Sequence, residues 1–599
     1  MHNVYQKPMP QPVQKHDIVA ILEEIGTLMR LAGENDFRAM AFDRAARTIE
    51  SLDDDINRHI EHQTLTDLKG IGKSIAQDVY TYAESGTIPV LDKLKEQVPD
   101  GLIAWLGISG MGPKKIYKIH QELGITELSE LREKCRDGSV AELPGMGKKT
   151  AEKILASIEW MEQFTDRCRI DEATVIAELF LDRMKDADGV QEISVAGSLR
   201  RAKETIGDID LLIAADPDHA ESLMTRFVET GSVTEILGQG ETKSSVRTKE
   251  GRQVDLRIVS REHYPAALMY FTGSKEHNVA MRQRARARKL QLNEYGLFHQ
   301  NAENQADFDR PLPAKSEADI YSHLDLGYIP PELREDHGEF DLAQKGSTPD
   351  LLEKQQIRGI MHAHSTWSDG KNSIREMAEA CISRGYEYLV LTDHSRSAAY
   401  AGGLSIEKVH QQWEEIDALN KEFAESAGGN GFVILKGIES DILSDGRLDY
   451  PDEVLAGFDM VIGSVHSALD QPPDAMLGRL MQAAEHPHIH MIGHPTGRLL
   501  LRRDGNKADL NRLITHAAAH HTAIEINASP WRLDLDWRYG RKARDAGLMS
   551  AVCPDAHNTD GLDHVRYGVG TARKAGFSAG HILNTLSVKD LFAWLKKSG

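Results

Sequence analysis

The feature that most restricts the fold of this chain is a repeat of short apolar strands in its C-terminal half, each with a histidine or an acidic residue at or near its end. YLVLTDH, FVILKGIES, DMVIGSVH, IHMIGHP and TAIEINA alternate there with helical segments. This alternation is typical of parallel α/β barrels, in which the polar residues at strand ends gather on one rim. The sequence therefore predicts a barrel with a polar site on that rim.

These polar residues have the chemistry of metal ligands. His362 and His364 share one face of a strand, and Asp369 follows just beyond it. Imidazole and carboxylate together suit Zn²⁺, Mn²⁺ or Fe²⁺, and they need no thiolate. The nine candidate ligands are His362, His364, Asp369, His394, Glu439, His466, His494, Asp555 and His557. Nine are too many for one ion, and bridging carboxylates allow up to three divalent metals, which could act on a phosphoryl group.

The N-terminal part is helical in pattern and contains three Gly-x-Gly turns, each before a helical segment. Such a turn can present backbone N–H groups and a positive helix end to a phosphate. A plain helix-helix turn is the alternative for one copy, but three copies, two followed by lysine, favour contact with a DNA backbone. They resemble helix-hairpin-helix motifs. The candidate DNA contacts are Gly70, Gly72, Gly110, Gly112, Gly145, Gly147 and Lys148.

Between these regions the chain carries closely spaced aspartates in strand patterns. Asp208 and Asp210 lie two residues apart, so both carboxylates share one face of a strand while Ile209 points into the core. Asp255 lies in a second strand, QVDLRIV, that could run alongside. Three converging carboxylates repel one another unless cations neutralise them, as in a two-metal phosphoryl-transfer site. Solvated charges at a strand edge are the alternative for the aspartate pair alone.

The succession GS, RR, GDID, VDLR, YFTGS and NEYG resembles the family X DNA polymerases, from the first hairpin to about Tyr328. The resemblance implies that Asp208, Asp210 and Asp255 hold two Mg²⁺ or Mn²⁺ ions in a nucleotidyltransferase palm. Asp255 would also help to activate the primer 3′ hydroxyl. The implied nucleotide contacts are Ser198, Arg201, Gly207, Tyr270, Phe271, Gly273 and Asn278, with Arg282 on the DNA side. The basic segment MRQRARARK favours contact with the DNA backbone, and a solvated charged face is its alternative.

The histidine motifs resemble the polymerase and histidinol phosphatase (PHP) superfamily over about residues 357–580. The resemblance implies a distorted (β/α)7 barrel with a three-metal site that hydrolyses phosphoesters. Glu525 and Asn527 also fit the superfamily. Arg498 and Arg532 are candidate phosphate clamps, with plain surface arginines as the alternative.

Two positions depart from the polymerase pattern. Relatives that excise a sugar phosphate use a lysine in the first hairpin's helix, where this chain has Asp78. Because an aspartate cannot form a Schiff base, lyase activity by that route is expected to be weak or absent, although Lys73 or Lys153 could substitute. Ile206 replaces a small polar residue that contacts phosphate in some relatives, so nucleotide affinity could be reduced.

Composition limits the remaining possibilities. Lys and Arg number 71 against 92 Asp and Glu, which gives a net charge of −21 and argues against a nonspecific polycationic DNA binder. The four cysteines form no CxxC pair, so reduced thiols are expected. No apolar run approaches the roughly 20 residues that a membrane-spanning helix needs, and the first residues lack the apolar core of a signal peptide. A cytoplasmic protein without membrane contact is therefore predicted.

The chain as a whole is predicted to be a multidomain α+β and α/β protein. The predicted domains are a helix-hairpin-helix domain at 1–90, fingers at 91–170, a palm at 171–260, a thumb at 261–332, a linker at 333–352 and a PHP barrel at 353–599. A polymerase core joined to this barrel is the arrangement of bacterial and archaeal family X polymerases.

The resemblance implies a monomeric DNA repair enzyme that fills gaps in primer-template DNA with deoxynucleoside triphosphates. Its barrel would act as a metal-dependent 3′-5′ exonuclease and could also cleave abasic sites or trim blocked 3′ ends. One alternative is a PHP nuclease or phosphatase that uses an inactive polymerase half as a DNA-docking scaffold. The others are a small-molecule phosphatase tethered to DNA-binding hairpins and a noncatalytic DNA-bridging protein.

Overall fold

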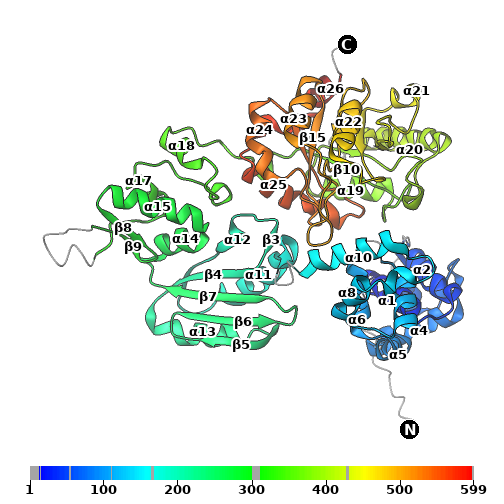
Figure 1. Ribbon diagram of the computed structural model, residues 1–599, viewed down its shortest axis with the longest axis horizontal. Helices are drawn as coiled ribbons and strands as arrows, with labels where there is room; N and C mark the ends of the chain where they lie inside the picture. Colours follow the sequence, from blue (N-terminus) through cyan, green and yellow to red (C-terminus); the bar gives the residue numbers. More distant parts are fainter. Residues whose placement is uncertain are drawn as a thin grey trace, which may run out of the picture. The chain divides into compact units, whose positions relative to one another are not determined.

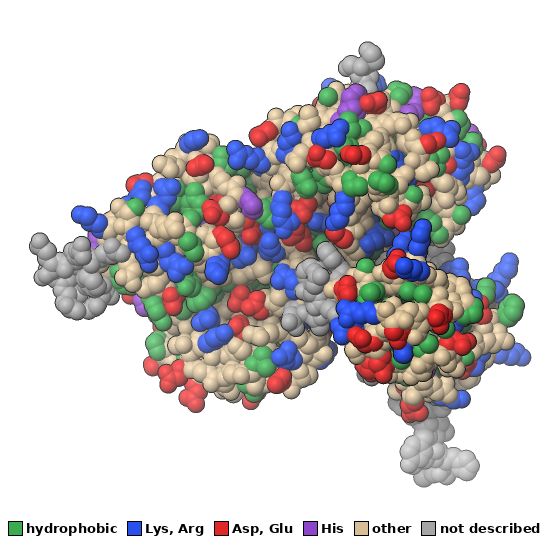
Figure 2. Space-filling view, in the orientation of Figure 1, with side chains coloured by type: hydrophobic (Ala, Val, Ile, Leu, Met, Phe, Trp, Pro, Cys, Tyr) green, Lys and Arg blue, Asp and Glu red, His purple; other side chains and the backbone are tan. Residues whose placement is uncertain are grey.

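The structure, a computed structural model, describes residues 13, 15–50, 52, 56–108, 111–162, 167–299, 310–425 and 431–596. Contacts within the chain divide it into two units, Met1–Thr165 and Asp166–Gly599, whose elements are labelled in Figure 1. None of the described helices is long and apolar enough to cross a lipid bilayer. All four cysteines are buried and unpaired. Figure 2 shows acidic and basic side chains interspersed over the visible face, so the net negative charge does not form a uniform surface.

The described residues of the first unit form helices around one apolar core. On the first helix, Leu22, Ile25 and Met29 recur at spacings of three and four and are buried, which is the pattern of a helix with one apolar face. Three helices begin at or directly after the Gly-x-Gly turns, at Lys73, Pro113 and Gly147. The helices are α1 (Lys15–Leu31), α2 (Asp36–Glu50), α3 (Ile56–Glu61), α4 (Lys73–Ser85), α5 (Pro89–Gln97), α6 (Asp100–Ala104), α7 (Pro113–Leu123), α8 (Leu128–Arg136), α9 (Ser139–Glu142) and α10 (Gly147–Glu162).

The second unit begins with a five-stranded sheet of order β2-β4-β7-β6-β5. Alternation along β4 buries Ile213 with Phe180 and Phe227 on one face, and Leu212 with Tyr264 on the other. The strands are β2 (Val190–Val195), β4 (Asp208–Ala215), β5 (Val233–Gln239), β6 (Lys243–Thr248) and β7 (Gln253–Val259), and β1 (Cys168–Arg169) pairs with β3 (Thr205–Ile206). The helices are α11 (Ile170–Met184), α12 (Gly197–Arg200), α13 (Ala220–Val228) and α14 (Tyr264–Thr272).

A smaller subdomain follows, built from α15 (Lys275–Ala287), β8 (Leu290–Asn293), β9 (Gly296–His299), α17 (Glu317–Ser322) and α18 (Glu339–Gln344). Its core includes Met281, Leu297 and Tyr321. The stretch 333–352, predicted as a linker, carries α18 and a fully buried Arg334. Arg334 donates to Glu317 over 2.7 Å, so this stretch is held by specific contacts rather than running free over the surface.

The C-terminal region is a seven-stranded parallel sheet in which the strand order follows the chain from β10 to β16. Ala363 and Ala556 form a parallel bridge that brings the first strand to the last, so the sheet curls into a nearly closed barrel (Figure 1). The strands are β10 (Gly359–Ala363), β11 (Tyr388–Leu391), β12 (Val433–Asp441), β13 (Met460–Ser464), β14 (Met491–Ile492), β15 (Ala523–Asn527) and β16 (Ser550–Cys553). The predicted (β/α)7 arrangement is confirmed.

Two apolar layers hold this barrel together. Ile360 and Leu389 pack with the surrounding helices, whereas their neighbours Met361 and Val390 pack with other strands and with Leu591 of the last helix. The helices are α19 (Ile374–Ser383), α20 (Ile406–Glu425), α21 (Asp452–Leu455), α22 (Pro473–Ala484), α23 (Leu510–Ala519), α24 (Gly540–Asp545), α25 (Val565–Lys574) and α26 (Val588–Leu595).

Candidate functional site

The predicted aspartates meet on two neighbouring strands of the palm sheet. β4 and β7 run parallel, and their register places Asp210 directly opposite Asp255. Burial raises the pKa of Asp210 to about 7, and the nearby charges of Asp208 and Asp255 add to this effect. A carboxylate that resists ionisation beside two others fits a site that divalent cations neutralise.

Asp255 is held by partners that the sequence pattern did not reveal. Lys243 lies 2.7 Å from one of its carboxylate oxygens, and Gln253 donates to the other over 2.9 Å. Burial works to raise the pKa of Asp255, but these two partners outweigh it and hold the pKa below its usual value. The ammonium of Lys243 therefore supplies positive charge to this carboxylate.

One pocket gathers most of the predicted nucleotide contacts. Its lining includes Ser198, Arg201, Tyr270, Phe271, Gly273, Asn278 and Arg282 together with Asp208 and Asp210. Gly207 and Asp255 of the predicted set are not among the lining residues. Asn278 donates its amide to the carbonyl oxygen of Tyr270 over 2.7 Å, while its own side-chain oxygen is buried without a hydrogen-bond partner. That acceptor is available for a ligand donor.

Gly197 begins α12 in the left-handed region, with φ of +57°, and a Cβ built there would lie 2.1 Å from Oδ2 of Asp210. No side chain fits this position without moving the carboxylate. Glycine therefore lets the backbone approach the acidic cluster and directs the short helix toward it.

The predicted hairpin contacts lie in the first unit. Gly70 and Gly145 have φ of +111° and +81°, which glycine adopts without strain. The Lys148 side chain is 87% exposed and therefore accessible to a ligand. Gly110 lies outside the described residues. Asp78 is half-buried on α4, and burial raises its carboxyl pKa, so the position offers no amine.

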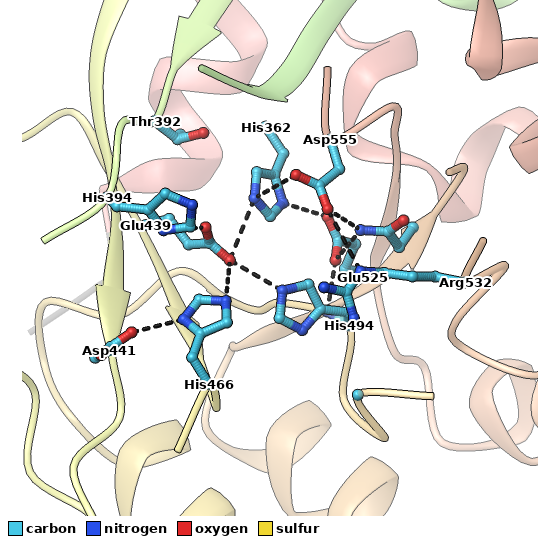
Figure 3. Close-up of polar contacts among 12 residues, drawn as sticks. His362, Thr392, His394, Glu439, Asp441, His466, His494, Glu525, Arg532 and Asp555 are labelled. Carbon is cyan, nitrogen blue, oxygen red and sulfur yellow. Dashed lines mark hydrogen bonds and ion pairs between the residues drawn. The ribbon is translucent and has the colours of Figure 1, made fainter. Parts of the chain in front are cut away.

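The candidate metal ligands of the barrel come together in three overlapping groups. His364 and His557 lie with Asp369 and His394; His362 and His364 lie with Asp555; and His394 lies with Glu439 and His466. Within each group the ligand atoms are within 4.8 Å of one another. The ninth predicted ligand, His494, places Nε2 3.0 Å from Oε1 of Glu439. Figure 3 shows His362, His466 and His494 directed toward Glu439.

The protonation of these histidines depends strongly on their neighbours. Burial lowers the pKa of His364 to about 3, and His557 and His394 contribute to the shift. Burial also disfavours protonated His466, but Glu439 and Asp441 outweigh it and raise the pKa to about 10. Nε2 of His362 lies 3.4 Å from Glu439 and 3.5 Å from Asp555, and Nδ1 of His364 lies 3.9 Å from Asp369. Buried ring nitrogens that face carboxylates at these distances fit divalent cations.

Further residues orient the ligands. Nδ1 of His362 lies 2.5 Å from Glu525, and Nδ1 of His466 lies 2.6 Å from Asp441 (Figure 3). Such contacts fix the ring and the nitrogen that faces a metal. Asp441 is not among the predicted ligands, although its spacing of two from Glu439 on β12 places both on one strand face.

The two arginines proposed as phosphate clamps differ. Arg498 donates to Asp536 over 2.8 Å and to the carbonyl oxygens of Arg532 and Leu533, so its guanidinium holds the loop. Arg532 reaches the metal-ligand cluster, with Nε 3.7 Å from Oδ2 of Asp555. Arg532 is therefore the one better placed to meet a phosphate.

Five family models match successive parts of the chain. Residues 13–88 match a helix-hairpin-helix domain, and residues 103–159 match a SAM-like helix-hairpin-helix tandem. Residues 167–253 match the DNA polymerase beta palm and residues 267–335 the DNA polymerase beta thumb. Residues 361–529 match the PHP domain.

Individual relatives cover different shares of the chain. A rat protein named DNA polymerase lambda is 25% identical and covers 52% of this chain and 55% of its own length. A probable phosphatase of Thermoanaerobacter is 26% identical over 37% of this chain and 85% of its own length. The Bacillus subtilis protein named DNA polymerase/3′-5′ exonuclease PolX is 40% identical over 98% of this chain and 100% of its own. With both halves present and this match along nearly the whole length, the chain belongs to the family X DNA polymerases that carry a C-terminal PHP domain.

Proposed function

We propose that the palm catalyses template-directed nucleotidyl transfer that fills short gaps in DNA, and that the PHP barrel removes 3′-terminal nucleotides. The observation that carries this proposal is that one chain holds two separate acidic centres. One consists of Asp210 opposite Asp255 beside a pocket, and the other is the histidine-rich cluster of the barrel. The Bacillus subtilis relative, whose name includes both activities, supports it.

In the palm, Asp208, Asp210 and Asp255 would hold two Mg²⁺ or Mn²⁺ ions. When bound, such ions neutralise the charge that develops on the transferred phosphoryl group. Asp255, whose carboxyl pKa lies below its usual value, stays ionised and would help to activate the primer 3′ hydroxyl. Ser198 and Arg201 would donate to the triphosphate.

The other pocket residues would select and position the nucleotide. Tyr270, Phe271 and Gly273 would lie against the incoming sugar and base, and Asn278 and Arg282 would contact the nascent pair and the template side. Gly207, near the triphosphate, completes the proposed set. The glycines of the three hairpins and Lys148 would hold the DNA backbone.

In the barrel, the nine ligands would hold up to three divalent metals, of which Mn²⁺, Zn²⁺ and Fe²⁺ all suit the donor set. Such metals activate water and stabilise charge on a phosphoryl group. Glu525 and Asp441 would keep His362 and His466 oriented toward the metals. Arg532 would bind the scissile phosphate. Cleavage at abasic sites and trimming of blocked 3′ ends are further reactions this site could catalyse.

The same proposal includes a monomeric protein and the domain limits predicted above. It also predicts weak lyase activity, because the half-buried Asp78 stands at the lysine position. Borohydride should therefore trap little or no protein–DNA adduct, and trapping that survives mutation of both Lys73 and Lys153 would contradict the expectation.

One experiment tests both activities. A gapped duplex labelled at the primer 5′ end is incubated with Mg²⁺ or Mn²⁺, with and without nucleotides, using wild type, Asp210→Ala and His364→Ala. Asp210→Ala should only shorten the primer and His364→Ala should only extend it. If His364→Ala fails to extend while wild type always shortens, the polymerase half is a DNA-docking scaffold. Loss of both activities in Asp210→Ala would contradict two independent sites.

A further inference from the structure

The last residue of helix α25 in the barrel contacts the polymerase part of the chain. The Lys574 side chain is 0% exposed, and its ammonium lies 2.6 Å from Oε1 of Glu335. It also donates to the carbonyl oxygens of Arg201 and Glu332 over 3.0 and 3.2 Å. An ammonium has three N–H donors, so these three acceptors satisfy it completely.

The same carboxylate oxygen of Glu335 also contacts the nucleotide pocket. Arg201 donates to it from Nε over 3.1 Å and donates from Nη1 to the carbonyl oxygen of Thr272 over 2.5 Å. These bonds hold the guanidinium at two of its three nitrogens. Nη2 is the nitrogen left to meet a ligand in the pocket that Arg201 lines with Ser198 and Asp210.

The charges around Glu335 make Lys574 important for the position of Arg201. Glu335 is the shared partner of three cations, because Lys203 also lies 3.8 Å from its second oxygen. While Lys574 occupies Oε1, that oxygen is divided between the ammonium and Nε of Arg201. Without Lys574 the carboxylate is free to draw the guanidinium into a two-bond pair, which is the preferred geometry of arginine with a carboxylate. That movement would take Nη2 away from the pocket.

We infer that Lys574, a residue of the PHP barrel, is a positioning residue for nucleotide binding in the palm: through Glu335 it keeps the Arg201 guanidinium directed at the triphosphate. This inference rests on the proposed role of Arg201. Lys574 is not one of the nine predicted metal ligands and belongs to none of the ligand groups of the barrel.

Lys574→Met, which keeps the length of the side chain and removes the charge, tests the inference. In extension of a one-nucleotide gap opposite thymine, the KM for dATP should rise about tenfold with kcat changed less than twofold. Shortening of a labelled single strand should stay within twofold of wild type. Glu335→Gln removes the carboxylate that holds Nε of Arg201, so it should also raise the KM for dATP, and the test does not depend on one variant folding.

Arg573→Met is the matched control. Arg573 precedes Lys574 on α25 and bonds to Glu332 and Glu353 over 2.7 and 2.6 Å, so it joins the same regions without touching Glu335. The KM of Arg573→Met for dATP should equal that of wild type. An equal KM rise in Arg573→Met would show that general contact between the regions matters, and would overturn the inference.

Arg201→Ala separates the inference from the function on which it rests. Adding Lys574→Met to Arg201→Ala should raise KM no further, because both changes act through one guanidinium. An additional tenfold rise, or an unchanged KM in Lys574→Met while Arg201→Ala raises it, would overturn the inference and leave the polymerase proposal intact. If wild type fails to extend the gap, the proposed function itself is wrong.

Discussion

Gly197 shows how little room a single residue leaves around the palm carboxylates. Because a Cβ there would lie 2.1 Å from Oδ2 of Asp210, Gly197→Ala should displace this carboxylate and lower primer extension about 100-fold. Gly238→Ala is the control, since a Cβ at Gly238 on the same sheet meets nothing within 4 Å. Single-nucleotide extension measures both, and equal rates in the two variants would show that Asp210 tolerates the displacement. Exonuclease activity should not change.

Glu525 supports the barrel site without being one of the predicted ligands. It bonds Nδ1 of His362 and the backbone N–H of His494, each over 2.5 Å. Loss of such a supporting carboxylate typically weakens metal binding 10- to 100-fold. Glu525→Gln should therefore need about 10- to 100-fold more Mn²⁺ for half-maximal exonuclease rate. Glu387→Gln is the control, because Glu387 pairs with Arg358 at the start of β11. This variant should need the same Mn²⁺ concentration as wild type for half-maximal exonuclease rate, and a similar shift in it would point to a general folding defect.

At the scale of strands and helices, spacing predicted which residues share a face. Of the strand pairs it indicated only that the strand of Asp255 could run beside that of Asp208 and Asp210, as β7 does beside β4. The aspartates two apart on β4 and the polar residues at the barrel strand ends could be identified because alternation and strand ends are visible in a sequence. Lys243 could not, because its contact with Asp255 depends on how β6 pairs with β7. The partner of Arg498, Asp536, is 38 residues away and was equally hidden.

The buried ion pair between Glu317, the first residue of α17, and Arg334 should make the free energy of unfolding depend on pH. Burial works to raise the pKa of Glu317, but Arg334 and Arg200 outweigh it and lower the pKa to about 2. Since the folded pKa lies below the unfolded value, the unfolded chain binds more protons as pH falls. The stabilisation, about 3 kcal/mol, is complete above pH 4.5 and is lost as pH falls toward 2.

Glu317→Gln should consequently lower the melting temperature most at pH 6, and the difference from wild type should narrow at pH 3.5. Differential scanning calorimetry at both pH values measures this. Asp325→Asn is the control in the same subdomain, since its pair with Arg288 is exposed and contributes little. A difference for Glu317→Gln that is constant with pH would show that packing, not charge, explains its effect.

For the whole molecule, metal binding at the ends of the barrel strands should raise the free energy of unfolding. The ligand groups draw His362 from β10, Glu439 from β12 and Asp555 from just after β16, so bound metal holds together parts far apart in the chain. Mn²⁺ at 100 times its dissociation constant should stabilise the folded state by about 2.7 kcal/mol per site. The melting temperature of wild type and Asp210→Ala should rise equally with Mn²⁺. His364→Ala removes a residue that two of the ligand groups share, so its melting temperature should rise less with Mn²⁺. An equal rise in this variant would show that the stabilising metal binds elsewhere.

The barrel strands stand in the same order in space as in the chain, from β10 to β16. The first strand carries His362, and Asp555 and His557 directly follow the last strand. Two of the three ligand groups contain Asp555 or His557, so they are complete only after the last strand has been made. A ribosome completes the palm pocket long before it reaches that strand. During synthesis, the residues that line the palm pocket are therefore made before the centre that would degrade DNA is complete, and a chain cut short before residue 555 lacks both that centre and Lys574.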